Sequence, residues 1–226
     1  MVRLCAAMSY AFTFHDAPLF ALPSGALHWP DRDLLVVSDL HFGKSARAAR
    51  HGGAALPPYE TRETLLRLET DLDTTQARHV LCLGDSFDAP DIGAALPEEE
   101  QLWITRLQAG RGWTWIEGNH DPGPMNLGGS HLAQLTLGPL TFRHIATDTG
   151  RGEVSGHYHP KARLALRGRS LSRPCFLLDE HRLILPAYGA YTGGLFTQSA
   201  PLATLMQPKA QAILTGPTPC AIPMPR

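Results

Sequence analysis

The chain has 226 residues, 43% of them hydrophobic, and a formal net charge of -1 at pH 7. This length and composition suffice for one domain of ordinary size with a substantial hydrophobic core. The nearly neutral charge excludes a general electrostatic attraction to nucleic acid, so any such affinity must come from local groups.

The cysteines and the apolar runs indicate the compartment. The 4 cysteines are widely spaced and form no C-x-x-C pair, which disfavours a zinc knuckle or a disulfide framework and favours a reducing environment. No run reaches the roughly 18 apolar residues of a membrane span. Residues 1–10 lack the sustained hydrophobic core of a secretory signal. We therefore expect a cytoplasmic protein without a membrane partner, either a monomer or a homodimer.

The first half of the chain alternates apolar and amphipathic segments. Residues 34–38, 80–83 and 113–117 are short, apolar and partly β-branched or aromatic, which predicts buried strands. Residues 57–72 and 97–107 open with proline, which suits a first helical turn, and continue with leucines at near-helical spacing. Such strand-helix alternation predicts a mostly parallel sheet.

After His131 the pattern changes to short strands separated by turns. The predicted strands are 134–137, 140–145, 161–166, 175–178 and 182–185. They indicate a second, mixed sheet packed on the first. We expect residues 216–226 to form an irregular tail, because they are dense in proline. No repeat or linker divides the chain, so residues 1–226 are predicted to form a single domain.

Four short motifs carry metal-ligating side chains, and the first three of them follow predicted strands. They are Asp39-Leu40-His41, Gly84-Asp85, Gly118-Asn119-His120-Asp121 and Gly156-His157-Tyr158-His159. Each alone could be an ordinary turn or cap. Their order and spacing suit loops that successive strands deliver to one edge of a layered domain. Imidazole, carboxylate and carboxamide groups together suit Mn, Fe or Zn, so the set predicts a metal centre.

These motifs resemble those of the calcineurin-like metallophosphoesterases, over about residues 35–160. The resemblance implies an α/β fold, the four-layer α-β-β-α sandwich with two mixed sheets. It implies that the first metal is held by Asp39, His41, Asp85 and His159. The second metal would be held by Asp85, Asn119, His157 and a lone upstream histidine, so that Asp85 bridges the two ions.

Two histidines could fill the upstream position. His144 matches better, because it ends an apolar strand and precedes the last motif by a short interval. His131 is the competing candidate.

The resemblance also implies how the reaction proceeds. Two divalent ions roughly 3.5 to 4 Å apart can share a water and lower its pKa toward about 7, so that hydroxide attacks phosphorus in line. Manganese is the expected metal, with iron or zinc as alternatives. His120 would stand beside the leaving group, where it can act as a general acid. We expect Asp121 to orient His120 through a hydrogen bond, with capping of the next turn as the equal alternative.

A narrower resemblance comes from residues beyond the ligands. Three stretches are similar to the ligase-associated DNA damage response endonucleases, the PdeM group: Asp39-Leu40-His41-Phe42-Gly43-Lys44, Gly84-Asp85-Ser86-Phe87-Asp88 and Leu185-Pro186-Ala187-Tyr188-Gly189-Ala190-Tyr191-Thr192-Gly193-Gly194. This resemblance implies a bacterial, manganese-dependent phosphodiesterase that cuts single-stranded DNA in repair, encoded beside a DNA ligase, an exonuclease and a helicase. The protein phosphatase branch is disfavoured, since its GDxVDRG arginine and GNHE glutamate are missing.

Basic residues near the motifs are candidates for binding substrate phosphates. They are Lys44, Arg47, Arg143, Lys161 and Arg163. From Lys161 to Arg173 the chain carries five cations and no acid. In a strand over 161–169, four of these cations would share one face and form a basic stripe toward the metals. Such a stripe could follow a phosphate backbone; the alternative is solubilising charge on an edge strand.

The sequence thus predicts a hydrolase, namely a DNA endonuclease that acts on single strands. One alternative is a nucleotide or cyclic-nucleotide phosphodiesterase acting on a small molecule. A basic trench favours the first function, and an enclosed base pocket favours the second. A scaffold that has lost its metals is disfavoured, because every expected ligand type is present.

Overall fold

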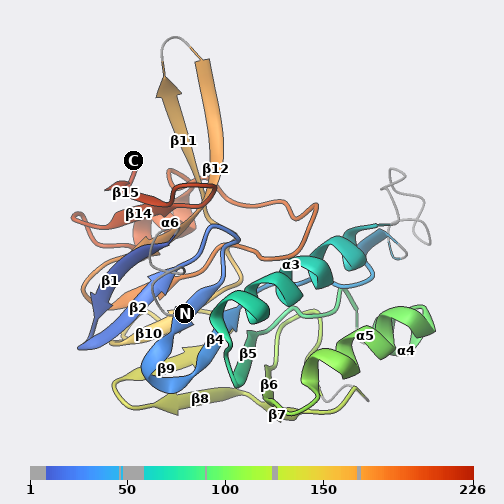
Figure 1. The fold of residues 1–226 in the computed structure, drawn as a ribbon. Coiled ribbons are helices and arrows are strands. Elements are labelled where there is room, and N and C mark those ends of the chain that lie inside the picture. Colours follow the sequence, from blue (N-terminus) through green and yellow to red (C-terminus); the bar gives the residue numbers. More distant parts are fainter. Residues whose placement is uncertain (1–8, 46, 48–58, 90, 124–126, 167–168) are drawn as a thin grey trace.

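Strands dominate the structure, a computed structural model that describes residues 9–45, 47, 59–89, 91–123, 127–166 and 169–226 (Figure 1). The first sheet contains, in spatial order, β1 (Tyr10–Phe14), β2 (Ala17–Ala21), β3 (Leu27–Trp29), β4 (Leu34–Val37), β5 (His79–Leu83), β6 (Gly112–Ile116) and β7 (Ser130–Leu132). Strands β1 to β4 pair antiparallel, and β4 to β7 pair parallel. The sequence predicts the parallel strands β4, β5 and β6, whereas it predicts neither β7 nor the antiparallel strands β1 to β3.

The second sheet is also mixed. Its order is β15 (Cys220–Pro223), β14 (Gln211–Leu214), β12 (Arg169–Leu178), β13 (Arg182–Ile184), β10 (Glu153–Ser155), β9 (Leu140–Arg143) and β8 (Gln134–Leu137). Strand β10 pairs parallel with both β9 and β13, and the other pairs are antiparallel. Strand β11 (Lys161–Leu166) pairs with β12, and the two form a hairpin that projects from the body (Figure 1).

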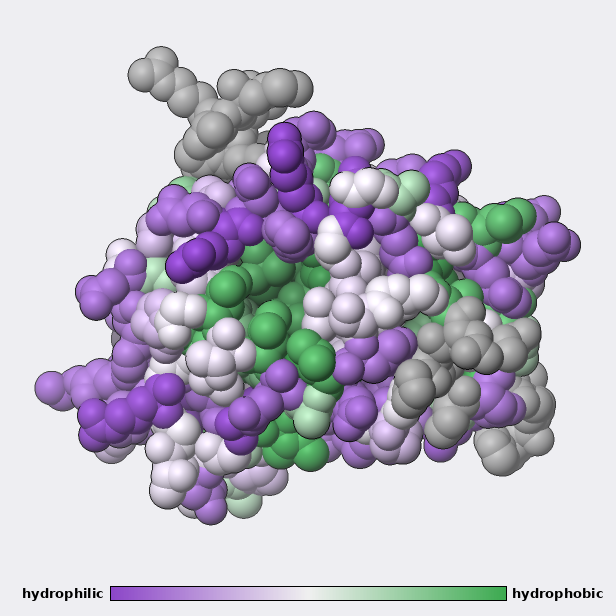
Figure 2. All heavy atoms as spheres, turned by 90° about the horizontal axis from the view of Figure 1, so that it is seen from below, coloured by the Kyte–Doolittle hydropathy of each residue, from purple (hydrophilic) through white to green (hydrophobic). Residues whose placement is uncertain are grey.

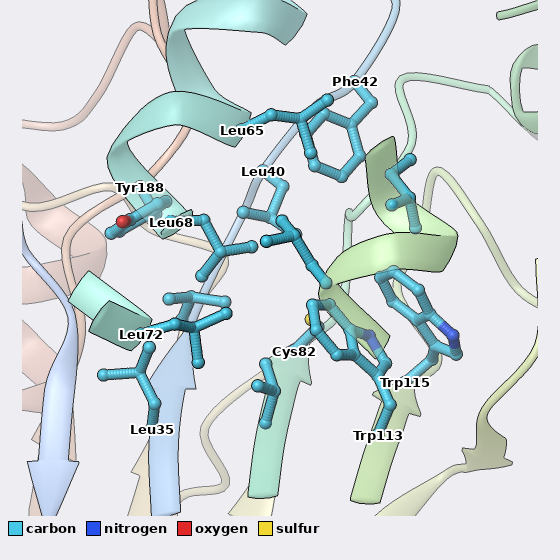
Figure 3. Packing of buried hydrophobic residues seen from close by; sticks show 14 of the residues in the cluster. Leu35, Leu40, Phe42, Leu65, Leu68, Leu72, Cys82, Trp113, Trp115 and Tyr188 are labelled. Carbon is cyan, nitrogen blue, oxygen red and sulfur yellow. The ribbon is translucent and has the colours of Figure 1, made fainter. Parts of the chain in front are cut away.

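Alternating side chains divide the core into layers. In β4, Leu35 and Val37 pack on the helical side, while Leu34 and Val36 join the cluster between the sheets. Helix α3 (Glu60–Thr75) buries Leu65, Leu68 and Leu72 in the cluster on the helical side of the first sheet (Figure 3). Helix α5 (Glu98–Gln108) packs on the same cluster.

The second sheet divides its side chains in the same way. In β12, Phe176 faces the first sheet, and Cys175 and Leu177 pack with Leu202 of α6 (Ala200–Leu205). The layers therefore follow the order helix, sheet, sheet, helix, which confirms the predicted sandwich. The remaining short elements are α4 (Ile92–Ala95) and a 3-10 turn at Pro30–Arg32. Among the described residues, no helix has the length and apolar character needed to cross a membrane.

The C-terminal segment differs from the prediction. We expected residues 216–226 to be irregular, but Cys220–Pro223 forms β15 and pairs with β14. Strand β15 lies at the edge of its sheet, where proline is tolerated because an edge strand needs only half of its backbone hydrogen bonds. Proline density alone therefore did not exclude a strand here.

A cavity of about 530 Å³ lies where β4, β5 and β6 begin, and Leu135 and Leu137 of β8 contribute to its lining. Strands β7 and β8 run along the lower side of the molecule in Figure 1. Seen from below, hydrophobic side chains gather in a hollow among hydrophilic ones (Figure 2). This cavity is at the opposite edge of the first sheet from the loops that carry the four motifs.

Candidate metal centre

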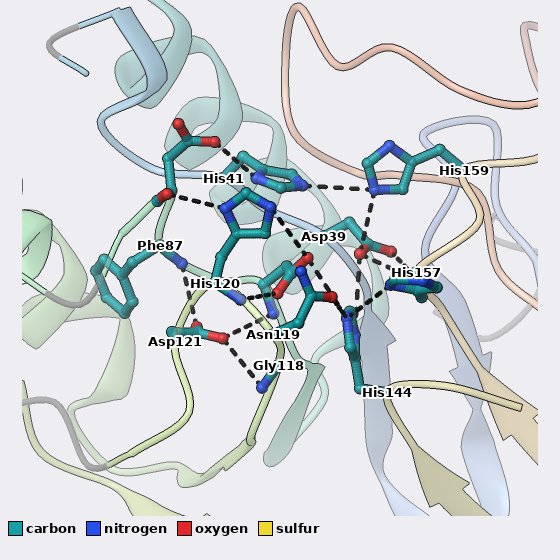
Figure 4. Close-up of polar contacts among 12 residues, drawn as sticks. Asp39, His41, Phe87, Gly118, Asn119, His120, Asp121, His144, His157 and His159 are labelled. Carbon is teal, nitrogen blue, oxygen red and sulfur yellow. Dashed lines mark hydrogen bonds and ion pairs between the residues drawn. The ribbon is translucent and has the colours of Figure 1, made fainter. Parts of the chain in front are cut away.

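The four motifs meet above the ends of strands from both sheets (Figure 4). Three of them follow the parallel neighbours β4, β5 and β6, whose carboxyl ends share one edge. His144 follows β9, and the last motif follows its parallel neighbour β10. Segments far apart in sequence therefore deliver Asp, Asn and His side chains to one place.

A first group of donor atoms comes from Asp39, His41 and His159. The His159 Nε2 atom lies 3.2 Å from Asp39 Oδ1 and 3.4 Å from His41 Nε2. The His41 ring is fixed from behind, because its Nδ1 atom lies 2.9 Å from Asp88 Oδ1. Nε2 of His41 is thus left free to bind an ion.

A second group surrounds the His144 Nε2 atom. The other ring nitrogen, Nδ1, donates a hydrogen bond to the Leu83 carbonyl oxygen at 2.8 Å. Around Nε2 lie Asn119 Oδ1 at 2.9 Å, His157 Nδ1 at 3.2 Å and Asp85 Oδ2 at 3.4 Å. These four residues are the set that the resemblance implies for the second metal, with His144 as the upstream histidine. The competing candidate, His131, lies on β7 beside Trp115.

Both groups have the dimensions of a metal site. Two donor atoms bound to one ion at about 2.0–2.2 Å can be separated by at most about 4.4 Å. The separations above, 2.9 to 3.4 Å, fall within this limit. Mixed nitrogen and oxygen donors suit Mn, Fe or Zn. The two groups therefore fit divalent ions, and Asp85 falls in the second group.

The backbone at these motifs is held in an uncommon conformation. Five predicted ligands have positive φ angles between 46° and 71°: Asp39, His41, Asp85, His157 and His159. Non-glycine residues rarely adopt this region, and where they do they cluster at functional sites. A close approach also explains Gly156, since a Cβ atom there would lie 1.7 Å from Ser38 Oγ.

The local electrostatics favour bound cations. Burial alone would raise the pKa of Asp39, but His159, His144 and the Ser38 hydroxyl together lower it. Burial also acts to raise the pKa of Asp85, and His144 and the His120 amide outweigh that effect. Both buried carboxylates are thus held in the charged form. Burial and the neighbouring His144 lower the pKa of His157, which favours the neutral imidazole that metals bind.

His120 stands beside both groups with its side chain 31% exposed. Its Nδ1 atom lies 3.0 Å from the Asp88 carbonyl oxygen and 3.2 Å from Arg47 Nη1. Either contact leaves Nε2 directed toward the cluster, where it lies 4.0 Å from Asp85 Oδ2. The geometry suits a group that exchanges a proton with a bound molecule.

Asp88 is a residue whose role was missed from the sequence. Its carboxylate contacts His41 and also accepts from Arg47 Nη1 at 3.2 Å, while its carbonyl group meets His120. It therefore positions His41 and His120 together. Asp88 is the last residue of Gly84-Asp85-Ser86-Phe87-Asp88, one of the stretches similar to the PdeM group, and this similarity is the feature of the sequence that points to it.

Asp121 does not orient His120 as predicted. Its Oδ1 atom accepts hydrogen bonds from the amides of Asp85 and Gly118, and its Oδ2 atom accepts from Ser86 and Phe87. Burial raises the pKa of Asp121 to about 6, and these amide bonds act in the opposite direction. The side chain thus braces the loop that carries Asp85, because that loop turns away from its strand and leaves several amides without backbone partners.

Removing this brace should destabilise the protein. Asp121→Ala would leave buried amides without acceptors, so we expect the free energy of unfolding to fall by about 3 kcal/mol. Urea denaturation of the metal-free protein measures this change. Asp73→Ala, at an exposed acid on α3, is the control. Equal stability of the two variants would contradict the bracing role.

Asp88 should matter for metal affinity. Because its carboxylate fixes the His41 ring, Asp88→Asn is expected to weaken manganese binding by about 10- to 100-fold. Isothermal titration calorimetry of metal-stripped protein with manganese measures the affinity. Glu98→Gln, at an exposed acid in the first turn of α5, should bind as the wild type does. Unchanged affinity of Asp88→Asn would show that His41 needs no such support.

The predicted phosphate-binding residues lie in different surroundings. Arg47 contacts Asp88 and His120, and Lys44 is half-buried near the first motif. Lys161 lines a cavity that also includes His159. Arg143 pairs instead with Glu153 at 3.2 Å and Gln134 at 2.8 Å, and Arg163 lies over the Phe196 ring at 4.1 Å. Of the predicted basic stripe, Arg167 lies outside the described residues.

Comparison with solved structures identifies a similar nuclease. The crystal structure of nuclease MPE from Pseudomonas putida matches 94% of this chain and 100% of its own, with 29% sequence identity and a TM-score of 0.71. No protein-family model matches the sequence, and no curated protein does. The chain thus has the fold of a nuclease and carries Asp and His groups that could hold metal ions.

Proposed function

We propose that this chain is a metal-dependent endonuclease of the PdeM group, which hydrolyses phosphodiester bonds in single-stranded DNA. The observation that carries the proposal is the pair of donor groups, formed by Asp39, His41 and His159 and by Asp85, His144 and His157. The likeness to a nuclease over 94% of the chain supports the same reaction class. Manganese is the proposed metal, and repair beside a ligase, an exonuclease and a helicase is the proposed setting.

Each part of the site would have a distinct task. Bound divalent ions would supply the Lewis acidity that activates water and neutralises phosphoryl charge. Asp39 and Asp85 would provide the buried negative charge that retains cations, while Asn119 and the histidines would supply the remaining donor atoms. Asp85 is proposed to be shared between the two ions.

His120 would serve the leaving oxygen. When its Nδ1 atom accepts a hydrogen bond from Arg47 Nη1, the neutral ring carries its proton on Nε2, which is directed toward the site. From Nε2 a proton can pass to the departing alkoxide. Arg47, with its side chain 39% exposed, adds positive charge next to this position. Such charge stabilises a phosphoryl group that gains negative charge during the reaction.

A circular single strand tests the proposal. Metal-stripped protein resupplied with manganese should convert a single-stranded DNA circle into linear molecules, which requires cutting at an internal bond. A duplex circle and a chromogenic phosphodiester are the comparisons. Hydrolysis of the chromogenic compound without any linearisation would move the substrate to the class of small nucleotides. Linearisation without added metal would contradict the metal-dependent reaction.

A further inference from the structure

A cavity of about 440 Å³ adjoins the proposed metal centre at His159. Its other walls include Lys161 and Arg173 at the foot of the β11–β12 hairpin and Tyr191 in the loop after β13. The volume lies in the range of cavities that bind small molecules. A substrate strand that leaves the metal centre on the His159 side would enter this space.

The loop over residues 186–194 is built against the metal-binding loops. The Tyr188 and Gly189 amides donate to the carbonyl oxygens of Ser38 and Asp39, at 2.8 and 3.1 Å. A Cβ atom at Gly189 would lie 2.1 Å from the Leu40 carbonyl oxygen, so a larger residue would disturb this approach. The loop is therefore positioned by the segment that carries Asp39.

The far end of the same loop is fixed to the His159 segment. The Leu195 amide donates to the Tyr158 carbonyl oxygen, and the Lys161 amide donates to the Leu195 carbonyl oxygen. A Cβ atom at Gly194 would lie 2.2 Å from the His159 carbonyl oxygen. The loop thus spans the two segments that supply the first donor group, and it runs from the hairpin foot toward α3 (Figure 1).

Tyr191 lies between these two anchor points. The residue is 47% exposed, and its φ angle of +56° is uncommon for a residue with a side chain. An exposed aromatic ring at a strained position beside a proposed catalytic centre is typical of a functional contact. Nucleic-acid bases stack on such rings, whatever their sequence.

The charge around the cavity complements a phosphate. Within the described part of the chain, Lys161 and Arg173 form no ion pair with an acid. The acid in the lining is Glu63, which Arg67 meets at 3.4 Å, so its charge is already partly balanced. Among the residues that the structure describes, the Lys161 ammonium group donates a hydrogen bond to the Thr192 carbonyl oxygen alone, at 3.4 Å. Two cations are therefore available to a ligand.

The geometry points to a subsite for the nucleotide that adjoins the scissile phosphate, with its base stacked on Tyr191 and its flanking phosphate bound by Lys161 and Arg173. This inference rests on the proposed function and specifies which part of a single strand the protein holds. A paired base could not stack on Tyr191 without leaving its duplex, which gives a physical reason for a single-stranded substrate.

Binding to two matched probes tests the subsite. The manganese-loaded His120→Ala variant, used to keep the strands intact, is titrated with a fluorescein-labelled oligothymidylate and with an abasic strand of equal length. We expect the oligothymidylate to bind more tightly. Adding Tyr191→Ala to this variant should weaken oligothymidylate binding on the order of tenfold and leave the binding of the abasic strand unchanged. Adding Tyr191→Phe should keep the preference for the oligothymidylate, because the aromatic ring remains. Tyr59→Ala, at a tyrosine 64% exposed near α3, is the control.

The two cations should behave differently from Tyr191. Lys161→Ala and Arg173→Ala are expected to weaken the binding of both probes by the same factor. Each substitution should also reduce the magnitude of the slope of log binding affinity against log salt concentration by about 0.7. If the His120→Ala variant binds the oligothymidylate and the abasic strand with equal affinity, the proposed subsite is wrong, whatever the Tyr191 variants show. A base preference in a protein that fails to cut DNA would instead sustain the subsite and overturn the proposed function.

Discussion

Asp85→Ala is expected to release both metal ions and to reduce activity to that of metal-free protein. The Asp85 carboxylate lies 3.4 Å from the His144 Nε2 atom of the second group, and it is proposed to reach the first ion as well. Its loss would remove a buried negative charge as well as a donor from the centre. Metal content per chain, measured by plasma mass spectrometry after dialysis, reports the change directly.

The number of ions that Asp85→Ala retains shows whether Asp85 binds one ion or both. Loss of one ion with retention of the other would restrict Asp85 to the second group, which is the one its carboxylate atom joins in the structure. Asp73→Ala removes an exposed acid of the same type and should retain both ions. Retention of both ions by Asp85→Ala would contradict its role as a ligand.

His120→Ala should retain both ions and cleave DNA about 10²- to 10⁴-fold more slowly, the usual contribution of a general acid. The ring is held by Asp88 and Arg47 rather than by the donor groups, so the ligands should remain in place. Single-turnover cleavage of a labelled single strand measures the rate, and metal analysis measures the content.

A chromogenic diester separates this role from a structural one. Nitrophenolate is stable as an anion and departs without a proton, so His120→Ala should slow its release far less than DNA cleavage. An equal loss on both substrates would exclude proton donation to the leaving group. Loss of metal would instead reassign His120 as a ligand, together with His41 and Asp88, which lie close enough to form a third donor group.

The parallel strands β4, β5 and β6 and the motifs that follow them could be predicted, because both depend on local signals. Short apolar runs before Asp39, Asp85 and Asn119 mark buried strands, and parallel strands bring the residues after them to one edge. The structure brings Asn119, His144 and His157 together around one point, as the resemblance implied. Their roles as ligands stay predictions that metal analysis can test.

Features that depend on tertiary partners could not be predicted. Strand β15 forms because β14 offers it an open edge, which its proline-dense sequence does not reveal. The bond partners of Asp121 are amides exposed by the left-handed turn at Asp85, and this turn is visible only in three dimensions. Arg143 preceded a predicted ligand in sequence, yet Glu153 on the neighbouring strand holds its side chain.

The central claim is that two donor groups hold two ions that drive phosphodiester hydrolysis. The most direct test is a manganese titration of metal-stripped protein in which bound metal and diester hydrolysis are measured together. We expect two ions per chain, full activity only when both are bound, and loss of metal in His144→Ala but not in His131→Ala. Full activity of protein without bound metal, or equal metal loss in the two histidine variants, would contradict the account.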